Sequence, residues 1–234
     1  MKKILDSRRS LKWMSIYLLL FGLFCLSLQA QSPIPSPEDF FGFKMGTARN
    51  IARWDNIVEY FYTLEKSCDK LKVVDMGPST MGYPFLVIFI SSAGNLNRMD
   101  ELQSINARLS DPRDLPEEEL EALIQKGTAV ICQSMSLHAT EIGGTQMAPE
   151  LTYDLITRED DETRHILDNV MFVLMPCFNP DGQIMVSDWY RKTLGTEYEG
   201  SSLPWLYHKY VGHDNNRDGD FLNMIESVYA AKIM

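Results

Sequence analysis

The stretch NVMFVLMPCFNPDG, residues 169–182, decides the fold class of this chain. Its central run, Val170 to Met175, shows no alternation of apolar and polar residues, which is typical of a strand covered on both faces. The turn formers from Asn179 to Gly182 then end the strand. A strand buried on both faces needs helices on each side of its sheet, so the stretch predicts an α/β protein.

Strand-like and helix-like segments alternate around this stretch. Apolar residues recur at three- and four-residue spacing in the predicted helices, and β-branched and aromatic residues fill the predicted strands. We therefore expect a mixed, mostly parallel central sheet with helices on both faces. From Gly182 onward the chain is polar and predicts loops. The predicted strands are 71–77, 83–92, 128–138 and 170–175, and the predicted helices are 54–68, 97–109, 115–127 and 143–157.

The first thirty residues have the pattern of an export signal. Five basic residues precede an apolar run over 13–28, and the small residue Ala30 follows it. We predict a signal peptide over 1–30, an extended proline-containing entry segment over 31–50, and one domain over 51–234. The alternative is an uncleaved signal, because the apolar run is nearly long enough to remain as a membrane anchor. The prediction places the mature protein outside the cytoplasm, in the periplasm or the extracellular space.

Charge and cysteine content narrow the class of protein. The net charge is −10, and removal of residues 1–30 would take away five positive charges and one negative charge, leaving −14. A nucleic-acid binder normally carries a basic face, so this class is excluded. Beyond residue 30 only Cys68, Cys132 and Cys177 remain, an odd number that does not predict a disulfide framework. We expect Cys132 and Cys177 to be buried in strands.

The segment LHATE places His138 and Glu141 three residues apart, directly after a predicted buried strand. Ligands of α/β proteins gather beyond the carboxyl ends of strands. Imidazole nitrogen and carboxylate oxygen both suit Zn²⁺, and a hydrolytic zinc keeps one position open for water. Two residues at this spacing also occur often by chance, so a capped helix start is the alternative interpretation.

Three further motifs follow in order: FNPDG at 178–182, WYRKT at 189–193 and GHDNNRDG at 212–219. Together with HATE, this ordered set resembles the zinc carboxypeptidases, the M14 metallopeptidases. The resemblance covers roughly residues 50–234 and is strongest from Val130 onward. It implies a zinc-carboxypeptidase-like sheet, a zinc cofactor, and hydrolysis of peptides at their C-termini.

The resemblance also implies roles for individual residues. His138 and Glu141 match the first two zinc ligands. Arg191 matches the arginine that stabilises the oxyanion of the attacked carbonyl, where negative charge develops in the transition state.

The resemblance also implies roles for residues of the last motif, GHDNNRDG. Asn216 and Arg217 match the pair that holds the terminal carboxylate of the substrate, for which the planar fork of arginine is suited. Asp214 matches the acid that orients a zinc-binding histidine through a hydrogen bond.

The chain departs from the family pattern at several positions. Ala139 and Thr140 stand between His138 and Glu141, where many members have an arginine that contacts substrate. The resemblance implies a third zinc ligand, a histidine, and a general-base glutamate further along. No histidine follows His213, and Glu226 is too close to Arg217 to fit that glutamate. We therefore expect the chain to be the N-terminal part of a longer domain, with a fold that is incomplete at its C-terminus.

A calcium loop is an alternative interpretation of the last motif. Asp214, Asn216, Asp218 and Gly219 fit positions 1, 3, 5 and 6 of an EF-hand loop. Position 12 is Ile225, where a bidentate acid is required, and this disfavours calcium. Of the other histidines, we expect His165 in an exposed loop and His208 at a packing or surface position.

The prediction is a secreted zinc metallocarboxypeptidase that acts on peptide or protein C-termini, without nucleic-acid partners. Contact with a membrane is expected only if the signal segment is retained. Two alternatives stay open: an amidase that acts on cell-wall peptides with the same scaffold, and a binding module or incomplete fragment without catalysis.

Overall fold

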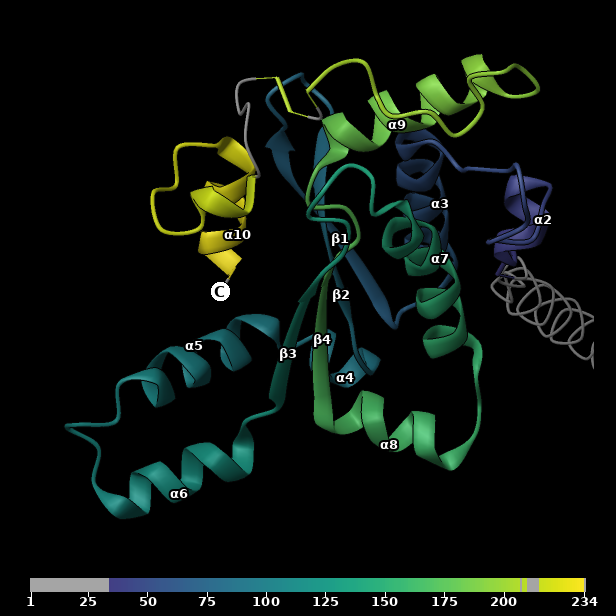
Figure 1. Ribbon diagram of the computed structural model, residues 1–234. Helices are drawn as coiled ribbons and strands as arrows, with labels where there is room; N and C mark the ends of the chain where they lie inside the picture. The colour runs from purple at the N-terminus through teal and green to yellow at the C-terminus, as the bar shows by residue number, and fades with distance from the viewer. Residues whose placement is uncertain (1–33, 207, 210–214, 234) are drawn as a thin grey trace, which may run out of the picture. The chain divides into compact units, whose positions relative to one another are not determined.

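A computed structural model of the protein describes residues 34–206, 208–209 and 215–233 (Figure 1). The predicted signal peptide over 1–30 lies outside these residues. None of the described helices is both long and apolar enough to span a bilayer. Helices and strands alternate as expected. The elements are α2 (Pro37–Phe41), α3 (Trp54–Ser67), β1 (Leu71–Pro78), β2 (Pro84–Ile90), α4 (Ala93–Leu96), α5 (Met99–Ser110), α6 (Glu117–Lys126), β3 (Ala129–Ser134), α7 (Ile142–Thr157), α8 (Asp161–Asn169), β4 (Val170–Met175), α9 (Pro180–Thr193), the 3₁₀ helix η1 (Asn215–Asp218) and α10 (Ile225–Ile233).

Within the described residues, the sheet has four strands in the order β1-β2-β4-β3. β3 and β4 pair in parallel, whereas β1 with β2 and β2 with β4 pair antiparallel. The α/β class and the mixed sheet are confirmed. The expected majority of parallel pairings is not found among these strands. The reason is that β1 and β2 are joined by only residues 79–83, and such a short connection forms an antiparallel hairpin.

Helices cover both faces of the sheet, as the apolar run in β4 predicted. Alternate side chains of β2 enter two different cores, because successive residues of a strand point to opposite faces. Leu86, Ile88 and Ile90 pack with buried residues of α3 and α7. Phe85 and Val87 pack with buried residues of α5 and α10 on the other face. Figure 1 shows α3 and α7 on one side of the strands and α10 on the other.

The helix α3 anchors the first of these cores. Its apolar residues at three- and four-residue spacing, Ile57, Tyr60, Phe61 and Leu64, are all fully buried. Complete burial of such side chains stabilises a fold by about 1.5–3 kcal/mol each. Trp54 begins the helix, and its indole Nε1 donates to the carbonyl of Pro84 at 2.9 Å, which ties α3 to the start of β2.

The strand β3 differs from its prediction as a buried strand. All six of its residues are exposed, and Val130 and Ile131 keep about half of their surface accessible. Cys132 is therefore exposed, whereas Cys177 is buried as expected. The physical reason is position: among the described strands β3 lies at the end of the sheet and pairs only with β4. An apolar sequence alone does not distinguish a central strand from such an edge.

The segment after Gly182 also differs from its prediction as a loop. Pro180 to Thr193 form the helix α9. Asn179 caps its start, because its side-chain oxygen accepts the N–H of Gly182 at 2.8 Å. Proline is favoured in the first helical turn, where its missing N–H costs nothing. The NPDG motif is thus a helix start, and WYRKT is the last turn of the same helix.

The predicted entry segment over 31–50 contains a short helix. Ser36 caps α2 by accepting the N–H of Asp39, and Gly42, at φ 75°, ends it. The rings of Phe40 and Phe41 lie 5.0 and 5.2 Å from that of Tyr60. This aromatic contact attaches α2 to α3, whereas the prolines predicted an extended segment.

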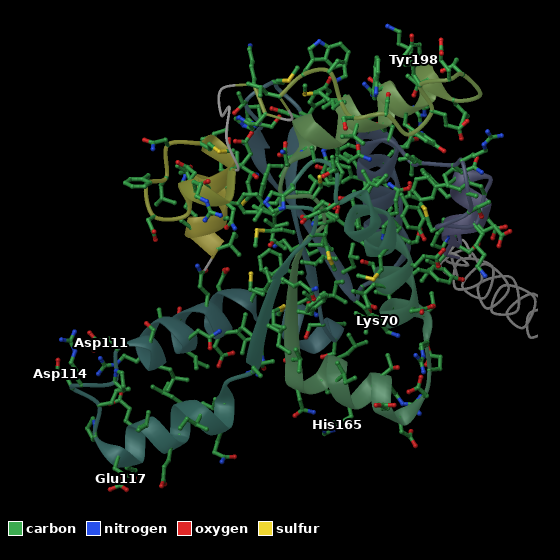
Figure 2. All side chains as sticks on the ribbon, in the orientation of Figure 1. Lys70, Asp111, Asp114, Glu117, His165 and Tyr198 are labelled. Atoms are coloured by element: carbon green, nitrogen blue, oxygen red, sulfur yellow. The ribbon has the colours of Figure 1, made fainter. Side chains whose placement is uncertain are left out.

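The helices α5 and α6 form a hairpin that extends away from the sheet (Figure 1). Leu102 attaches α5 to the core that it shares with Phe85 and Val87, whereas α6 buries none of its residues. Acidic side chains gather at the tip of the hairpin, where Figure 2 labels Asp111, Asp114 and Glu117.

Candidate functional site

The candidate site begins where β3 and β4 end. Their parallel register pairs Ser134 with Met175, so the segments that follow the two strands leave the sheet side by side. Two backbone hydrogen bonds continue the pairing: Met135 N donates to Met175 O at 2.9 Å, and Phe178 N donates to Met135 O at 2.8 Å. The HATE segment and the start of α9 are therefore held at the same edge of the sheet, as the strand-end rule predicts.

The HATE segment is a turn that leads into α7, with Glu141 at the N-cap position. Ser136, at φ 51°, fixes this turn. Its hydroxyl donates to the carbonyl of Glu141 and accepts the N–H of Thr145 at 3.0 Å. At Gly144 a Cβ atom would lie 3.3 Å from Ser136 Oγ, so the glycine permits this close approach.

His138 and Glu141 lie together in this turn. His138 Nδ1 and Glu141 Oε1 are 2.7 Å apart, and the N–H of His138 donates to Glu141 Oε2 at 3.1 Å. Both side chains are partly accessible. One imidazole nitrogen and one carboxylate oxygen that converge on a point fit two positions of a four-coordinate zinc. Two ligands of one zinc stand about 3.4 Å apart, so binding would require only a small separation of the pair.

The two residues between them have different environments. Ala139 is buried and Thr140 is exposed. The position of Thr140 is therefore open to solvent. Its short side chain cannot make the contact with substrate that an arginine makes at this position in many members of the family.

The residues predicted to form the substrate clamp lie on η1. Asn216 and Arg217 are exposed, while Asn215 and Asp218 on either side of them are buried. The side-chain amide of Asn215 donates to the carbonyl of Leu137 at 2.7 Å, which brings η1 beside His138. Sequence reasoning assigned no role to Asn215. The sequence signal that could have identified Asn215 is its position directly before the predicted clamp residues in the last motif.

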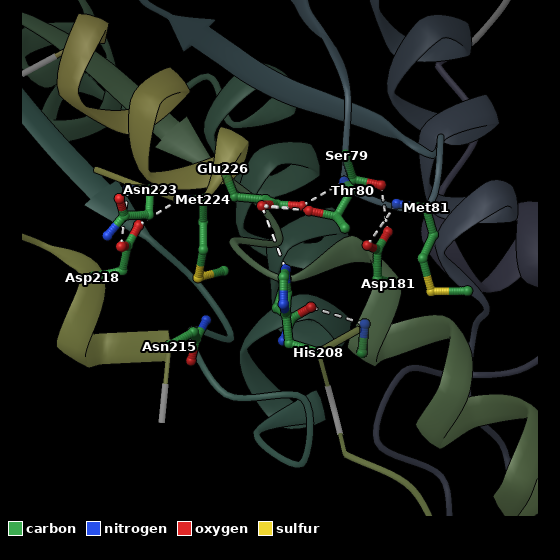
Figure 3. Close-up of polar contacts among 12 residues, drawn as sticks. Ser79, Thr80, Met81, Asp181, His208, Asn215, Asp218, Asn223, Met224 and Glu226 are labelled. Carbon is green, nitrogen blue, oxygen red and sulfur yellow. Dashed lines mark hydrogen bonds and ion pairs between the residues drawn. The ribbon is translucent and has the colours of Figure 1, made fainter. Parts of the chain in front are cut away.

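Asp218 fixes the other end of this turn. Its carboxylate accepts the N–H groups of Asn223 at 3.0 Å and Met224 at 2.8 Å (Figure 3). Burial raises the pKa of Asp218, but these hydrogen bonds outweigh burial and hold the pKa below its usual value. Asp214, which was predicted to orient a zinc-binding histidine, and His213 beside it lie outside the described residues. Asp218 serves here as a structural acceptor within the turn.

Arg191 lies in the last turn of α9 and is exposed. Its Nη2 donates to the carbonyl of Ile51 at 2.9 Å. Ile51 also lines an open groove of about 370 Å³, and Ile142 and Gly143 are among the other residues that line it. These two residues directly follow Glu141. The hydrogen bond thus attaches Arg191 to a residue that lines the groove beside the HATE turn.

A second group of ionisable residues was not predicted as a site. Asp181 at the start of α9, His208, and Glu226 on α10 are each no more than 1% exposed. Figure 3 shows them beside the turn that joins β1 and β2. His208 is buried, so the predicted surface position is wrong for it. His165 is exposed, as predicted, but lies on α8 and not in a loop. Glu226 is enclosed by the fold, so it is no candidate for a general base in an open site. Asp181 belongs to the FNPDG motif, which comes shortly after the buried strand β4, and this was the signal available in the sequence.

Comparison with known proteins gives one family. A family model described as zinc carboxypeptidase matches residues 57–231, about three quarters of the chain. The match includes the HATE turn, all of α9 and η1. A comparison with curated proteins finds no match.

Two solved structures are among those that are similar to this chain. The carboxypeptidase A of Helicoverpa armigera is 18% identical, with a TM-score of 0.42, over 78% of this chain and 34% of that one. A protein of Shewanella denitrificans OS-217, provisionally described as a carboxypeptidase A, is 14% identical, with a TM-score of 0.47, over 79% of this chain and 37% of that one. The chain spans about a third of the length of these structures.

Proposed function

Because this chain belongs to the zinc carboxypeptidase family, we propose that the protein is a zinc-dependent metallocarboxypeptidase, which hydrolyses the peptide bond next to a free C-terminus. The family consists of zinc peptidases, so peptides are the class of substrate that membership supports. The amidase and the binding module without catalysis are the rival outcomes of the experiment below.

The observation that carries the proposal is the contact between two motifs. The hydrogen bond from Asn215 to Leu137 O joins the turn that bears Asn216 and Arg217 to the turn that bears His138 and Glu141. A carboxypeptidase needs such proximity, because its substrate carboxylate lies only one residue from the bond that is cut. An endopeptidase has no use for a carboxylate clamp beside its metal ligands.

His138 and Glu141 are the proposed zinc ligands of this chain. When bound, zinc would activate water for attack on the peptide carbonyl. Arg191 would move from Ile51 O to the carbonyl oxygen, where its positive charge stabilises the charge that develops there. Asp214 would hold a zinc-binding histidine in one tautomer.

Asn216 and Arg217 are the proposed clamp for the terminal carboxylate. A guanidinium can donate two parallel hydrogen bonds to the two carboxylate oxygens, and the amide of Asn216 can donate a further one. Both side chains are exposed on η1, so a peptide end can reach them. This arrangement makes the proposed specificity that of an exopeptidase.

Export is a separate part of the proposal. The basic head and apolar run of residues 1–30 support secretion through a cleaved signal peptide. Expression in the native host followed by N-terminal sequencing tests it. A mature chain that begins at Gln31 is expected, and a chain that retains Met1 in the membrane fraction would show an uncleaved anchor.

The experiment for the activity uses the full-length protein and matched peptides that differ only at the C-terminus. We expect zinc-dependent release of the last residue from the free acid at a much higher rate than from the C-terminal amide. Chelation should abolish the activity, and added Zn²⁺ should restore it in the wild type but not in His138→Ala. Cleavage of muropeptides alone would identify the amidase. Zinc or peptide binding without turnover would identify the binding module.

A further inference from the structure

Asp181, His208 and Glu226 form a compact buried cluster, although they come from separate parts of the chain. Their ligand-type atoms all lie within 4.8 Å of one another. Each residue is at most 1% exposed. Buried charged side chains are rare unless they are paired or coordinate a metal ion, so the cluster requires an explanation.

The distance between the imidazole of His208 and the carboxylate of Glu226 is compatible with a shared metal ion. His208 Nε2 and Glu226 Oε2 are 3.6 Å apart. Direct N–H···O hydrogen bonds have distances of about 2.7–3.2 Å. Two ligands that share one metal ion at about 2.1 Å, with a tetrahedral angle between them, are about 3.4 Å apart. The separation is therefore close to that of two ligands of one cation, with adjustments of a few tenths of an ångström.

The charge of the cluster points in the same direction. Asp181 and Glu226 bring two carboxylates together in a buried site. The two carboxylates carry a charge of −2 when ionised, and one protonated imidazole can offset only half of it. A divalent cation bound to a neutral imidazole would balance the charge completely.

The residues around the cluster already orient both carboxylates. The hydroxyl of Ser79 donates to Asp181 Oδ1, and the N–H of Met81 donates to Asp181 Oδ2 at 2.9 Å. Thr80 donates to Glu226 through its N–H, at 2.7 Å, and its hydroxyl, at 3.2 Å. Figure 3 shows these contacts converging from the turn between β1 and β2. Carboxylate ligands of metal ions are typically fixed by hydrogen bonds of this kind.

We propose that Asp181, His208 and Glu226 are the ligands of a second, structural metal site in this protein, in addition to the zinc ligands proposed at His138 and Glu141. One imidazole nitrogen and two carboxylate oxygens suit a divalent ion of the zinc class. The ion joins the start of α9, the segment at His208 and α10 to the β1–β2 turn. It thereby stabilises the part of the fold that lies between Arg191 and the clamp residues.

The test uses Co²⁺ as a spectroscopic probe of the metal-free full-length protein. The double variant His138→Ala/Glu141→Gln removes the proposed catalytic ligands, so metal bound by this protein reports on other sites. We expect one equivalent of Co²⁺ with visible d–d absorption, and an upward shift of the thermal unfolding midpoint on metal addition. The addition of His208→Gln should weaken Co²⁺ binding by more than about 100-fold, because even the loss of an outer-shell partner costs 10–100-fold.

The matched control is His165→Gln in the same double variant, because His165 is an exposed histidine on α8 (Figure 2). It should leave Co²⁺ binding unchanged. If His208→Gln does not fold, Asp181→Asn takes its place. The paramagnetic shift of the His208 ring protons in the double variant decides the question without any change to the cluster.

Two results would overturn the proposal. One is the absence of bound Co²⁺ in the folded double variant, which would show that the cluster is a buried histidine–carboxylate network. The other is Co²⁺ binding that persists after His208→Gln or Asp181→Asn. Neither readout depends on peptidase activity, so failure of this proposal is distinguishable from failure of the proposed function.

Discussion

The side-chain amide of Asn215 donates a hydrogen bond of 2.7 Å to the backbone carbonyl of Leu137. These residues are 78 positions apart in the chain, and each adjoins a motif with a predicted chemical role. Leu137 precedes the predicted zinc ligand His138, and Asn215 precedes the predicted clamp residues. A buried side chain thus links the two motifs through the backbone, while the clamp residues themselves remain exposed.

Asn215→Ala should disconnect these motifs. The substitution leaves the carbonyl of Leu137 without this donor, and we expect the free energy of unfolding to fall by about 1–3 kcal/mol. Urea denaturation measures the change, and kcat/KM for a free-acid peptide should fall as well. The control is Asn169→Ala, which removes a comparable amide-to-carbonyl hydrogen bond on the exposed surface of α8. Equal changes in both variants would count against a specific link.

Trp54→Phe tests the attachment of α3 to β2. The indole is fully buried and donates to Pro84 O, so phenylalanine leaves a cavity and an unsatisfied carbonyl. We expect a loss of about 1–3 kcal/mol in the free energy of unfolding. Trp205→Phe is the control, because Trp205 is 57% exposed, and its effect should stay within about 0.5 kcal/mol. Similar losses in the two variants would contradict the described packing.

Alkylation of cysteines tests the exposure of β3. Cys132 is exposed on this strand, whereas burial raises the pKa of the Cys177 thiol to about 12. Since the thiolate is the reactive form, iodoacetamide should modify Cys132 in the folded chain and leave Cys177 intact. Reaction at Cys132 should accelerate as the pH rises, because partial burial raises its pKa as well. Mass spectrometry of the digested protein locates the label, and protection of Cys132 would show that β3 is covered.

Asp160 should make the stability of α8 depend on pH. Hydrogen bonds from the N–H and hydroxyl of Thr163 lower the pKa of Asp160 to about 2, against about 3.9 for an unperturbed aspartate. A lowered folded-state pKa means that the stabilisation is present above about pH 4 and is lost as the pH falls toward 2. Asparagine caps a helix at any pH, so the unfolding midpoint of wild type relative to Asp160→Asn should fall across this window. A constant difference between the two proteins from pH 6 to pH 2 would contradict the capping role.

The sequence predicted those parts of the fold that depend on local periodicity. The spacing of Ile57, Tyr60, Phe61 and Leu64 identified α3, and the uninterrupted apolar run of β4 correctly placed helices on both faces of the sheet. Whether neighbouring strands pair in parallel or antiparallel was harder to predict, because it depends on the lengths of the connections between them. The five-residue connection from β1 to β2 carried that information.

Burial was harder to predict than element type. The sequence of β3 is as apolar as a central strand, but its exposure follows from its place at the end of the described sheet. The helix α9 was missed because its polar residues resemble a loop, although Asn179 and Pro180 are favourable residues for a helix start.

The candidate site was predicted only in part. HATE and NPDG could be assigned to strand ends because apolar runs precede them. The contact between Asn215 and Leu137, and the cluster of Asp181, His208 and Glu226, join residues that are far apart in sequence and have no common spacing. Such contacts depend on the tertiary fold.

The central claim is that Arg217 binds the free carboxylate of a peptide substrate. The most direct test compares Arg217→Ala with wild type in the full-length protein, using a peptide and its C-terminal methyl ester, with Arg164→Ala as an exposed control on α8. We predict that Arg217→Ala lowers kcat/KM for the free acid by about 10- to 100-fold, as expected for the loss of a charged hydrogen bond. The value for the ester should change little, and Arg164→Ala should match wild type on both. Equal losses on the acid and the ester after Arg217→Ala would contradict the claim.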